Sequence, residues 1–236
     1  MGYVPLKGII VSSKPYREKD KILVIFTDKL GKIRAKIRSV RSGNSKRSGF
    51  ADDFLYEELL LYKKSGYYSI TEAKLLSAFL DAKLVPENYF TLLYIKELIL
   101  LFTPYEQQDM RIFNLLKNTL SALSEPSMAK TFTVFFILRF LEYSGNPVLV
   151  ASEGKGEIYF NPEKGGFSRS AEGGISVSEE LAYEVKAVSR SEINDLHSPL
   201  LFQEQIIDLL NRFIAYHTGS KHFLKFLETI KKLDNI

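Results

Sequence analysis

The chain has 236 residues, of which 45% are hydrophobic, and its formal net charge is +4. This length and composition allow one large domain or two to three small ones, and they are not typical of a disordered protein. The chain contains no cysteine, which excludes disulfides, cysteine-based zinc sites, iron–sulfur clusters and a cysteine nucleophile.

Charge is distributed unevenly along the chain. Residues 1–80 hold 16 Lys and Arg against 8 Asp and Glu, a net charge of +8, whereas residues 81–236 hold 16 against 20, a net charge of −4. Residues 14–47 alone hold 12 basic and 3 acidic residues, a net charge of +9. A basic first third joined to a mildly acidic remainder indicates an anionic partner for the first third.

Five short segments in the first third have the composition of strands, with many β-branched and aromatic residues: residues 3–14, 21–28, 32–38, 55–63 and 67–75. Glycine-containing turns at residues 29–32 and 64–66 predict two hairpins. Five closely connected strands without an intervening helix predict a small closed barrel, and the OB-fold is the five-stranded barrel that recurrently binds single strands.

The third predicted strand alternates strictly. Lys32, Arg34, Lys36 and Arg38 fall on one side, and the apolar residues between them fall on the other. Four like charges on one strand face favour an anionic ligand such as nucleic-acid phosphate. The competing interpretation is an ordinary solvated strand face, since long basic side chains are common on exposed strands.

Further basic residues extend this predicted face at both ends, and a loop rich in glycine and serine follows it at residues 41–49. The complete set of candidate DNA-binding residues is Arg17, Lys21, Lys29, Lys32, Arg34, Lys36, Arg38, Arg41, Lys46 and Arg47. Aromatic residues lie among the basic ones, and we expect most to be core and one or two to contact a base: Tyr16, Phe26, Phe50, Phe54, Tyr56, Tyr62, Tyr67 and Tyr68.

From about residue 82 the apolar spacing becomes helical. We expect helices over residues 87–102, 106–123 and 127–143, the last nearly all apolar and therefore central in a bundle. Residues 145–176 form a glycine-rich insertion with a hairpin near residues 158–160. Ser176 and Glu179 have the spacing of a capping box, and helices are expected up to residue 188 and over residues 199–217 and 221–233.

The predicted fold is therefore α+β, with a basic barrel at residues 1–80 and a helical domain at residues 81–236 that contains the insertion. No phosphate-loop, dinucleotide-binding, nucleophile-elbow or zinc-protease spacing is present, which favours a protein that is not an enzyme. His217 and His222 lack a third ligand, so a metal is not expected. The absence of a leader or of a long apolar run predicts a cytoplasmic protein without a membrane segment. A DNA partner for the basic barrel would make it nucleoid-associated.

One long pattern is similar to a known family. The motif Arg17-Glu18-x-Asp20-x5-Phe26-Thr27-x3-Gly31-Lys32-x-Arg34 resembles the N-terminal signature of the RecO family of bacterial recombination mediators, and Lys46-Arg47 occupies the place of its basic loop. Residues 139–147, 159–166 and 212–217 also resemble landmarks of this family, in the same order along the chain.

The resemblance implies an N-terminal OB-fold, a helical domain and an inserted zinc-finger-like module. It implies that the protein binds single- and double-stranded DNA and anneals complementary strands. It also implies two partners, RecR and the acidic C-terminal tail of single-stranded DNA-binding protein, and a role in loading RecA onto coated strands. Many members carry two Cys-x-x-Cys pairs at stretches matching residues 150–154 and 168–172, where this chain has none, so no zinc cofactor is expected.

An acidic peptide tail needs an apolar pocket with a basic rim, and the candidates in the helical domain are Lys130, Arg139 and Arg212. Two other partners would fit a basic barrel. RNA is one, because backbone contacts alone separate RNA from DNA poorly, and an acidic protein is the other. A nuclease would need a carboxylate cluster, and the carboxylates here are scattered.

Overall fold

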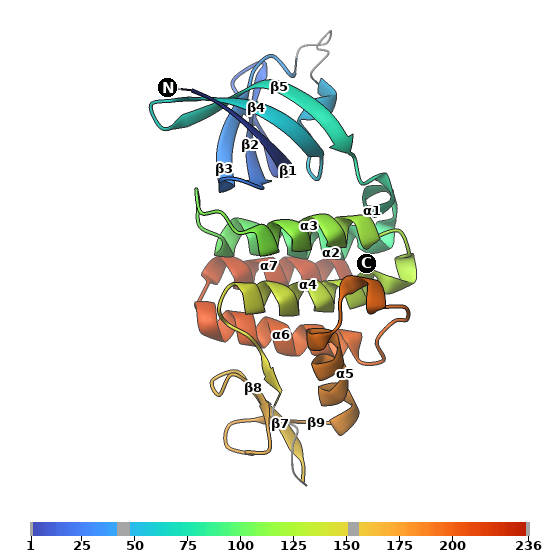
Figure 1. Cartoon of the computed structure of the whole chain (residues 1–236). Coiled ribbons are helices and arrows are strands. Elements are labelled where there is room, and N and C mark those ends of the chain that lie inside the picture. The colour runs from blue at the N-terminus through green and yellow to red at the C-terminus, as the bar shows by residue number, and fades with distance from the viewer. Residues whose placement is uncertain (1, 42–47, 151–155, 235–236) are drawn as a thin grey trace. The chain divides into compact units, whose positions relative to one another are not determined.

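The computed structural model describes residues 2–41, 48–150 and 156–234 (Figure 1). The chain divides into two compact units. Unit 1 comprises Met1–Leu84 and Leu98–Ser121, and unit 2 comprises Val85–Glu97 and Ala122–Ile236. The long helix α2, Tyr89–Phe102, contributes its first half to unit 2 and its last turns to unit 1. The boundary predicted at residue 80 stays a prediction.

Unit 1 contains a closed five-stranded barrel with the strand order β1-β2-β3-β5-β4 (blue to teal in Figure 1). All neighbouring strands pair in the antiparallel direction except β3 and β5. These two strands are parallel, and their pairing closes the barrel. This arrangement confirms the predicted OB-fold and α+β class. The strands are Gly2–Tyr16, Asp20–Thr27, Gly31–Ile37, Tyr56–Lys64 and Tyr67–Ser77; short helices η1 and α1 span Ser48–Phe50 and Leu80–Leu84.

Alternate residues of each strand fill the barrel. On β3 these are Ile33, Ala35 and Ile37, all buried, as the period-two pattern predicts. At one level of the barrel the inward position on β4 is Glu57, which pairs with Gly8 of β1. Glu57 is completely buried, and neither of its carboxylate oxygens has a hydrogen-bond partner among the described residues.

Part of the outer barrel surface is also buried. Strand pairing places Tyr56, Ile9, Phe26 and Lys32 in one row across β4, β1, β2 and β3. Ile9, Phe26 and Lys32 are fully buried on this outer row because the helical part of unit 1 covers it. The Tyr56 ring meets Phe113 of helix α3, Met110–Ala122, with 6.2 Å between the ring centroids.

Helix α3 spans Met110–Ala122 and begins four residues later than predicted. Asp109 caps it, because its carboxylate accepts hydrogen bonds from the backbone N–H groups of Arg111 and Ile112 at 2.9 and 3.2 Å. The residues before Asp109 lie along β3 instead: the N–H of Glu106 donates to the carbonyl of Lys32 at 2.9 Å. Tertiary pairing thus overrides the helical spacing of this segment.

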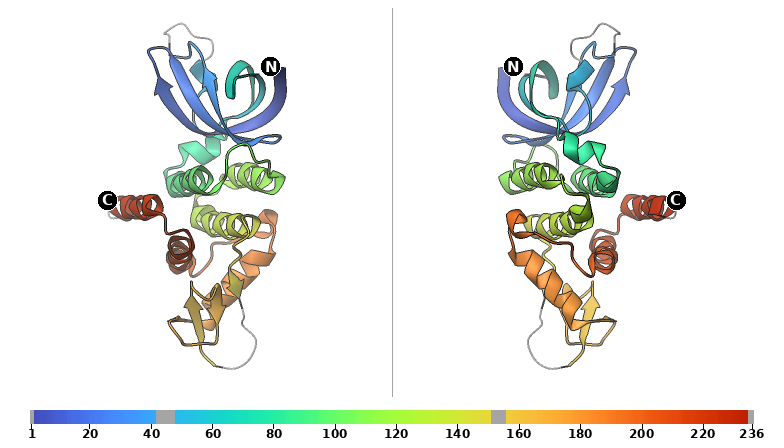
Figure 2. Two further views of the ribbon diagram at one scale, coloured as in Figure 1. Left: turned by 90° about the vertical axis from the view of Figure 1, so that its left-hand side faces the viewer. Right: turned by 90° about the vertical axis from the view of Figure 1, so that its right-hand side faces the viewer.

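Unit 2 is built around helix α4, Ala129–Tyr143, whose apolar side chains are buried on nearly all sides, as predicted. Figure 2 shows α4 flanked by α5 and α6, with α7 beside α6. The first half of α2 joins α4 through the Thr91 hydroxyl, which lies 2.8 Å from that of Thr133. The remaining helices are η2 (Pro86–Asn88), η3 (Pro126–Met128), α5 (Glu179–Arg190), η4 (Ile193–Asp195), α6 (Gln203–Thr218) and α7 (Lys221–Asp234).

The capping box predicted at Ser176 is wrong by two residues. Ser178 is the N-cap of α5, and its hydroxyl accepts a hydrogen bond from the N–H of Leu181 at 3.1 Å. Ser176 belongs to strand β9 and pairs with Tyr159. Strand pairing therefore extends up to the residue before the cap.

The insertion of unit 2 forms a small sheet of order β6-β8-β7-β9, and its central hairpin lies where the sequence predicts one. The Phe160 and Phe167 rings pack across this hairpin with 4.9 Å between their centroids. The strands are Leu149–Val150, Ile158–Asn161, Gly166–Ser168 and Ile175–Val177. Of the described helices, none has the length and apolar character needed to cross a membrane.

We predict that Glu57 makes unit 1 less stable as the pH rises. Burial raises the pKa of Glu57 from 4.5 to about 7. Between pH 4.5 and pH 7 the Glu57 carboxyl keeps its proton in the folded state but has lost it in the unfolded state. The free energy of unfolding therefore falls as the pH rises through this range. Above pH 7 the cost is constant, at most about 3 kcal/mol. Glu57→Gln should therefore unfold at a higher temperature than the parent protein at pH 8, and by a smaller margin at pH 5, in calorimetry.

The matched control is Glu58→Gln, the exposed neighbour on the same strand, which should leave the pH profile of the melting temperature unchanged. If the melting temperatures of the parent and Glu57→Gln proteins changed in parallel from pH 5 to pH 8, the raised pKa of Glu57 would be contradicted.

Candidate nucleic-acid interface

Among the ten candidate DNA-binding residues, the structure exposes five: Arg17, Lys29, Arg34, Arg38 and Arg41. Lys21 and Lys36 are half-buried, and Lys32 is buried. Lys46 and Arg47 lie outside the described residues. The outer side of β3 therefore presents Arg34 and, just past its end, Arg38, with the other exposed cations on neighbouring turns.

Lys32 corrects the prediction of four exposed cations on one strand face. Its side chain is 2% exposed, and its ammonium donates hydrogen bonds to the carbonyls of Ile99 and Leu100 at 3.1 and 2.7 Å. These carbonyls belong to the last turn of α2, where backbone oxygens lack helical partners and the helix dipole is negative. Lys32 is a helix C-terminal cap and not a surface cation. Strand pairing places Lys32 opposite the apolar Phe26, a register that the turn predicted at residues 29–32 did not give.

The burial of Lys32 has an electrostatic cost. Desolvation, with a smaller contribution from the nearby Arg34 guanidinium, lowers the pKa of Lys32 from 10.5 to about 8. The Tyr105 ring compensates in part, because the Lys32 Nζ lies 4.6 Å from its centroid. At neutral pH the ammonium is still the predominant form.

The half-buried cations have protein partners. Lys36 forms an ion pair with Asp20 at 2.7 Å, and Lys21 forms one with Asp52 at 3.0 Å. The hydrogen bond from Lys36 is the main cause that lowers the pKa of Asp20, followed by one from the N–H of Ser39. Asp20 thus neutralises part of the positive charge in the middle of the predicted face.

Two exposed tyrosines border the cations. Tyr16, which the sequence singles out, lies 5.4 Å from the Arg17 guanidinium and 5.2 Å from the Lys36 ammonium, measured to its ring centroid. Tyr105 lies beside Arg34, whose Nε donates to the Tyr105 hydroxyl at 3.0 Å. Sequence reasoning missed Tyr105 because it lies in the break between the helices predicted over residues 87–102 and 106–123. Asp109, a residue type that favours N-caps, was the available signal that the second helix starts later.

The other aromatic candidates on the barrel range from buried to exposed. Phe26, Phe54 and Tyr68 are buried, and Phe50, Tyr56 and Tyr62 are half-buried. Tyr67 is exposed at the β4–β5 turn. Three of the eight aromatic candidates are therefore core residues, fewer than the sequence predicts.

The tail-binding candidates of unit 2 differ in accessibility. Lys130 lines a cavity of about 150 Å³ whose apolar walls include Phe90, Tyr94 and Ile207, and it forms an ion pair with Glu204 at 2.5 Å. Arg212 is exposed and pairs with Asp208 at 2.8 Å.

Arg139, the third tail-binding candidate, has a side chain that is only 12% exposed. Its guanidinium donates to the carbonyl of Ser191 at 2.6 Å and to the Glu142 carboxylate at 2.8 Å. This geometry favours an internal role for Arg139, joining α4 to the end of α5, over the predicted place on a binding rim.

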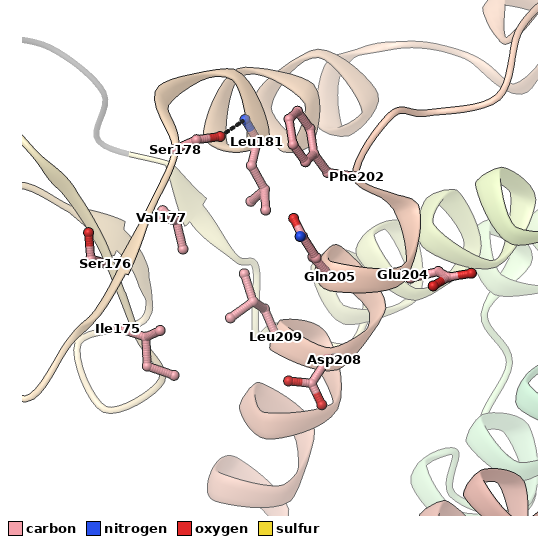
Figure 3. Close-up of a pocket in the computed structure, with 10 residues that line it drawn as sticks. All are labelled: Ile175, Ser176, Val177, Ser178, Leu181, Phe202, Glu204, Gln205, Asp208 and Leu209. Carbon is pink, nitrogen blue, oxygen red and sulfur yellow. Dashed lines mark hydrogen bonds between the residues drawn. The ribbon is translucent and has the colours of Figure 1, made fainter. Parts of the chain in front are cut away.

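A second hollow of unit 2, of about 610 Å³, lies between β9, the start of α5 and α6. Figure 3 shows Leu181, Val177 and Leu209 around it, with the amide of Gln205 among them. Glu204 lines both this hollow and the Lys130 cavity, so the two are neighbours on α6. The larger hollow is mainly apolar and contains none of the three predicted basic residues.

The insertion does not fit a zinc ion. The chain has no cysteine, and no group of three potential metal ligands occurs within the described ranges, His217 and His222 included. The buried amide of Asn161 organises the turn instead: its oxygen accepts from the N–H of Glu163 at 2.9 Å, and its nitrogen donates to the carbonyl of Glu172 at 2.8 Å. Lys164 closes the same turn through an ion pair with Glu172 at 2.6 Å.

Two family models match this chain. The model of the recombination protein O N-terminal region matches residues 1–79, and the model of its C-terminal region matches residues 84–225. The chain belongs to the RecO family. The first match covers the strands of the barrel, and the second covers helices α2 to α6 together with the small sheet.

Curated RecO relatives are similar over most of their length. A protein named DNA repair protein RecO from Dehalococcoides mccartyi strain 195 is 28% identical over 218 residues, covering 86% of this chain and 85% of the relative. One from Alkaliphilus metalliredigens is 27% identical and covers 98% and 99% of the two chains. One from Caldicellulosiruptor saccharolyticus is 30% identical over 61% of this chain and 59% of its own.

The structure gives physical reasons for the RecO-like motif Gly31-Lys32-x-Arg34. Gly31 has φ +63°, and a Cβ there would lie 1.8 Å from the carbonyl oxygen of Gln107, so only glycine fits. Lys32 caps α2, and Arg34 is the exposed cation. Gly31 and Lys32 therefore hold the barrel to the helical part of unit 1, whereas Arg34 does not.

We predict that Lys32 and Arg34 differ in their effect on stability. Lys32→Ala removes the ammonium from two helix-terminal carbonyls in a buried place, which should lower the free energy of unfolding by about 2–4 kcal/mol. Arg34→Ala, the matched control on the same strand, removes an exposed side chain and should cost less than about 1 kcal/mol. Urea unfolding followed by circular dichroism measures both, and equal losses would contradict the assignment of Lys32 as an internal cap.

Proposed function

We propose that this RecO-family chain binds single- and double-stranded DNA through the outer side of β3 and acts as a DNA repair and recombination mediator without turnover chemistry. The observation that carries the proposal is the pair Arg34 and Arg38, exposed on and just beyond one strand of an OB-fold barrel. Arg17, Lys29 and Arg41 are exposed on turns of the same barrel. The names of the relatives, DNA repair protein RecO, support the same role.

Guanidinium and ammonium groups of this kind bind phosphate and carry little information about base sequence. Binding should therefore be non-specific and steeply dependent on salt. A cationic surface that holds two strands reduces their mutual repulsion and raises their local concentration, which is the physical basis for strand annealing. We further propose that RecR is a partner and that RecA is loaded indirectly, as the family resemblance implies.

The proposed binding site for the acidic tail of single-stranded DNA-binding protein is the cavity beside Lys130. Its apolar walls would take the apolar residues of a tail, and the Lys130 ammonium would pair with a carboxylate in exchange for Glu204. Arg212 lies on the same helix as Glu204 and Asp208 and would supply a second cation at the rim.

We predict that the β3 cations determine the salt dependence of DNA binding. If about six phosphates are neutralised, the plot of log K against log salt concentration should have a slope of about −4 for single strands. Replacing Arg34, Lys36 and Arg38 with alanine should make this slope shallower by about 1 to 2, the lower value applying if Lys36 stays paired with Asp20. Fluorescence anisotropy of a labelled oligonucleotide across a salt series measures both.

The matched control removes the same charge from unit 2, by changing the exposed Arg190, Lys221 and Lys225 to alanine. This control should keep the parent slope. A parent slope near zero, or equal slopes for the two triple variants, would contradict the β3 interface. Competition with RNA of the same sequence distinguishes a DNA protein from an RNA-binding one.

We predict that Lys130→Ala weakens binding of the acidic tail peptide up to about fivefold, the value of one exposed ion pair. Isothermal titration calorimetry with the peptide measures the change. Lys221→Ala, which removes an exposed lysine of α7, is the control and should bind like the parent. Unchanged affinity in Lys130→Ala would contradict this location for the tail.

A further inference from the structure

The segment that joins α2 to α3 lies along β3 like an added strand. Tyr105 and Lys32 form a parallel β-bridge, and the N–H of Glu106 donates to the carbonyl of Lys32 at 2.9 Å. The Gln108 side chain donates to the carbonyl of Asp28 at 2.7 Å, and Glu106 pairs with Lys63 at 3.1 Å. This connection is therefore held to the barrel on both sides, so Tyr105 has a fixed position beside the cationic strand.

The Tyr105 ring is held but not enclosed. Its side chain is 44% exposed. The buried Lys32 Nζ lies 4.6 Å from the ring centroid, and the Arg34 guanidinium carbon lies 5.1 Å from it. The Arg34 Nε also donates to the Tyr105 hydroxyl, which fixes the orientation of the ring. An exposed aromatic ring with a defined orientation, next to an exposed arginine, is the arrangement that binds a nucleotide by stacking the base and pairing the phosphate.

We propose that Tyr105 is a stacking site for one unpaired nucleobase, with Arg34 binding the adjoining phosphate; the inference rests on the proposed DNA binding. A base in a duplex has both faces covered by its neighbours, so only a single strand can offer one to Tyr105 without the cost of unstacking. Phosphate contacts alone do not distinguish the two forms in this way. Tyr105 thereby gives the barrel a preference for single strands that the cations by themselves do not supply.

Tyr105 suits this role better than the other exposed tyrosine near the cations. Tyr16 borders Lys36, whose ammonium is already paired with Asp20 at 2.7 Å. Within the described residues, no carboxylate forms an ion pair with Arg34. The hydrogen bond from Arg34 to the Tyr105 hydroxyl can therefore be exchanged for one to a phosphate. The site is thus a ring and a cation that both face solvent and already lie together.

The first test compares two oligonucleotides of equal length, one with ordinary bases and one abasic throughout, so that both present the same phosphates. The parent protein should bind the ordinary strand more tightly, and Tyr105→Leu should weaken that binding roughly 5- to 100-fold. The same variant should leave binding of the abasic strand and of duplex DNA unchanged. Tyr105→Phe, which keeps the ring, should behave like the parent, and Tyr183→Leu in unit 2, which removes a tyrosine that is 69% exposed, is the matched control.

The outcomes separate this inference from the proposed function. If the parent bound neither strand at low salt, the proposed DNA binding would fail, and the stacking site with it. If the parent bound both strands equally, or if Tyr105→Leu weakened all three nucleic acids by one factor, DNA binding would stand and the stacking site would be overturned. Thermal unfolding of each variant identifies a loss that comes only from misfolding. If Tyr105→Leu misfolds, the fluorescence measurement with Tyr105→Trp decides instead.

A second measurement uses the absence of tryptophan from the chain. Tyr105→Trp introduces a single fluorophore at the proposed site, and stacking of a base on it should quench its emission. The ordinary single strand should quench and the abasic strand should not, while Tyr183→Trp should be insensitive to both. Quenching by the abasic strand to the same extent would overturn the stacking site.

Discussion

The contact between the Lys32 ammonium and the last turn of α2 is the interaction on which unit 1 depends. It joins a strand of the barrel to a helix more than sixty residues further along the chain, through the carbonyls of Ile99 and Leu100. The helix terminus supplies two acceptors and a favourable dipole, which offset the desolvation of a buried charge. Because α2 ends at this point, the following segment can run along β3 and place Tyr105 there.

The alternating strand β3 divides its cations between two tasks. Lys32, at the end covered by helices, is structural, whereas Arg34 faces solvent. Lys36 is intermediate, since its ammonium is exposed in part and is neutralised by Asp20. Cations at alternate positions of one strand therefore differ in exposure and in pairing: Lys32 is buried, Lys36 is paired with Asp20, and Arg34 is exposed.

The insertion shows how side-chain packing and hydrogen bonds can hold a small sheet together. The Phe160 and Phe167 rings form a small core, and the Asn161 amide together with the Lys164–Glu172 ion pair ties the turn. Each of these contacts connects residues close in sequence, so the chain closes short loops at a low entropic cost. Ring packing, amide hydrogen bonds and one ion pair thus hold the described part of the insertion together.

Patterns of local periodicity determined much of this protein by themselves. They predicted the five strands of the barrel, the buried positions Ile33 and Ile37, and the central place of α4, because strand and helix periods decide which side chains share a face. Only the tertiary structure decided the burial of Lys32, the late start of α3 and the place of Tyr105. These features depend on which distant segment covers a given face, and a covered face and a solvated one can have the same alternation in sequence.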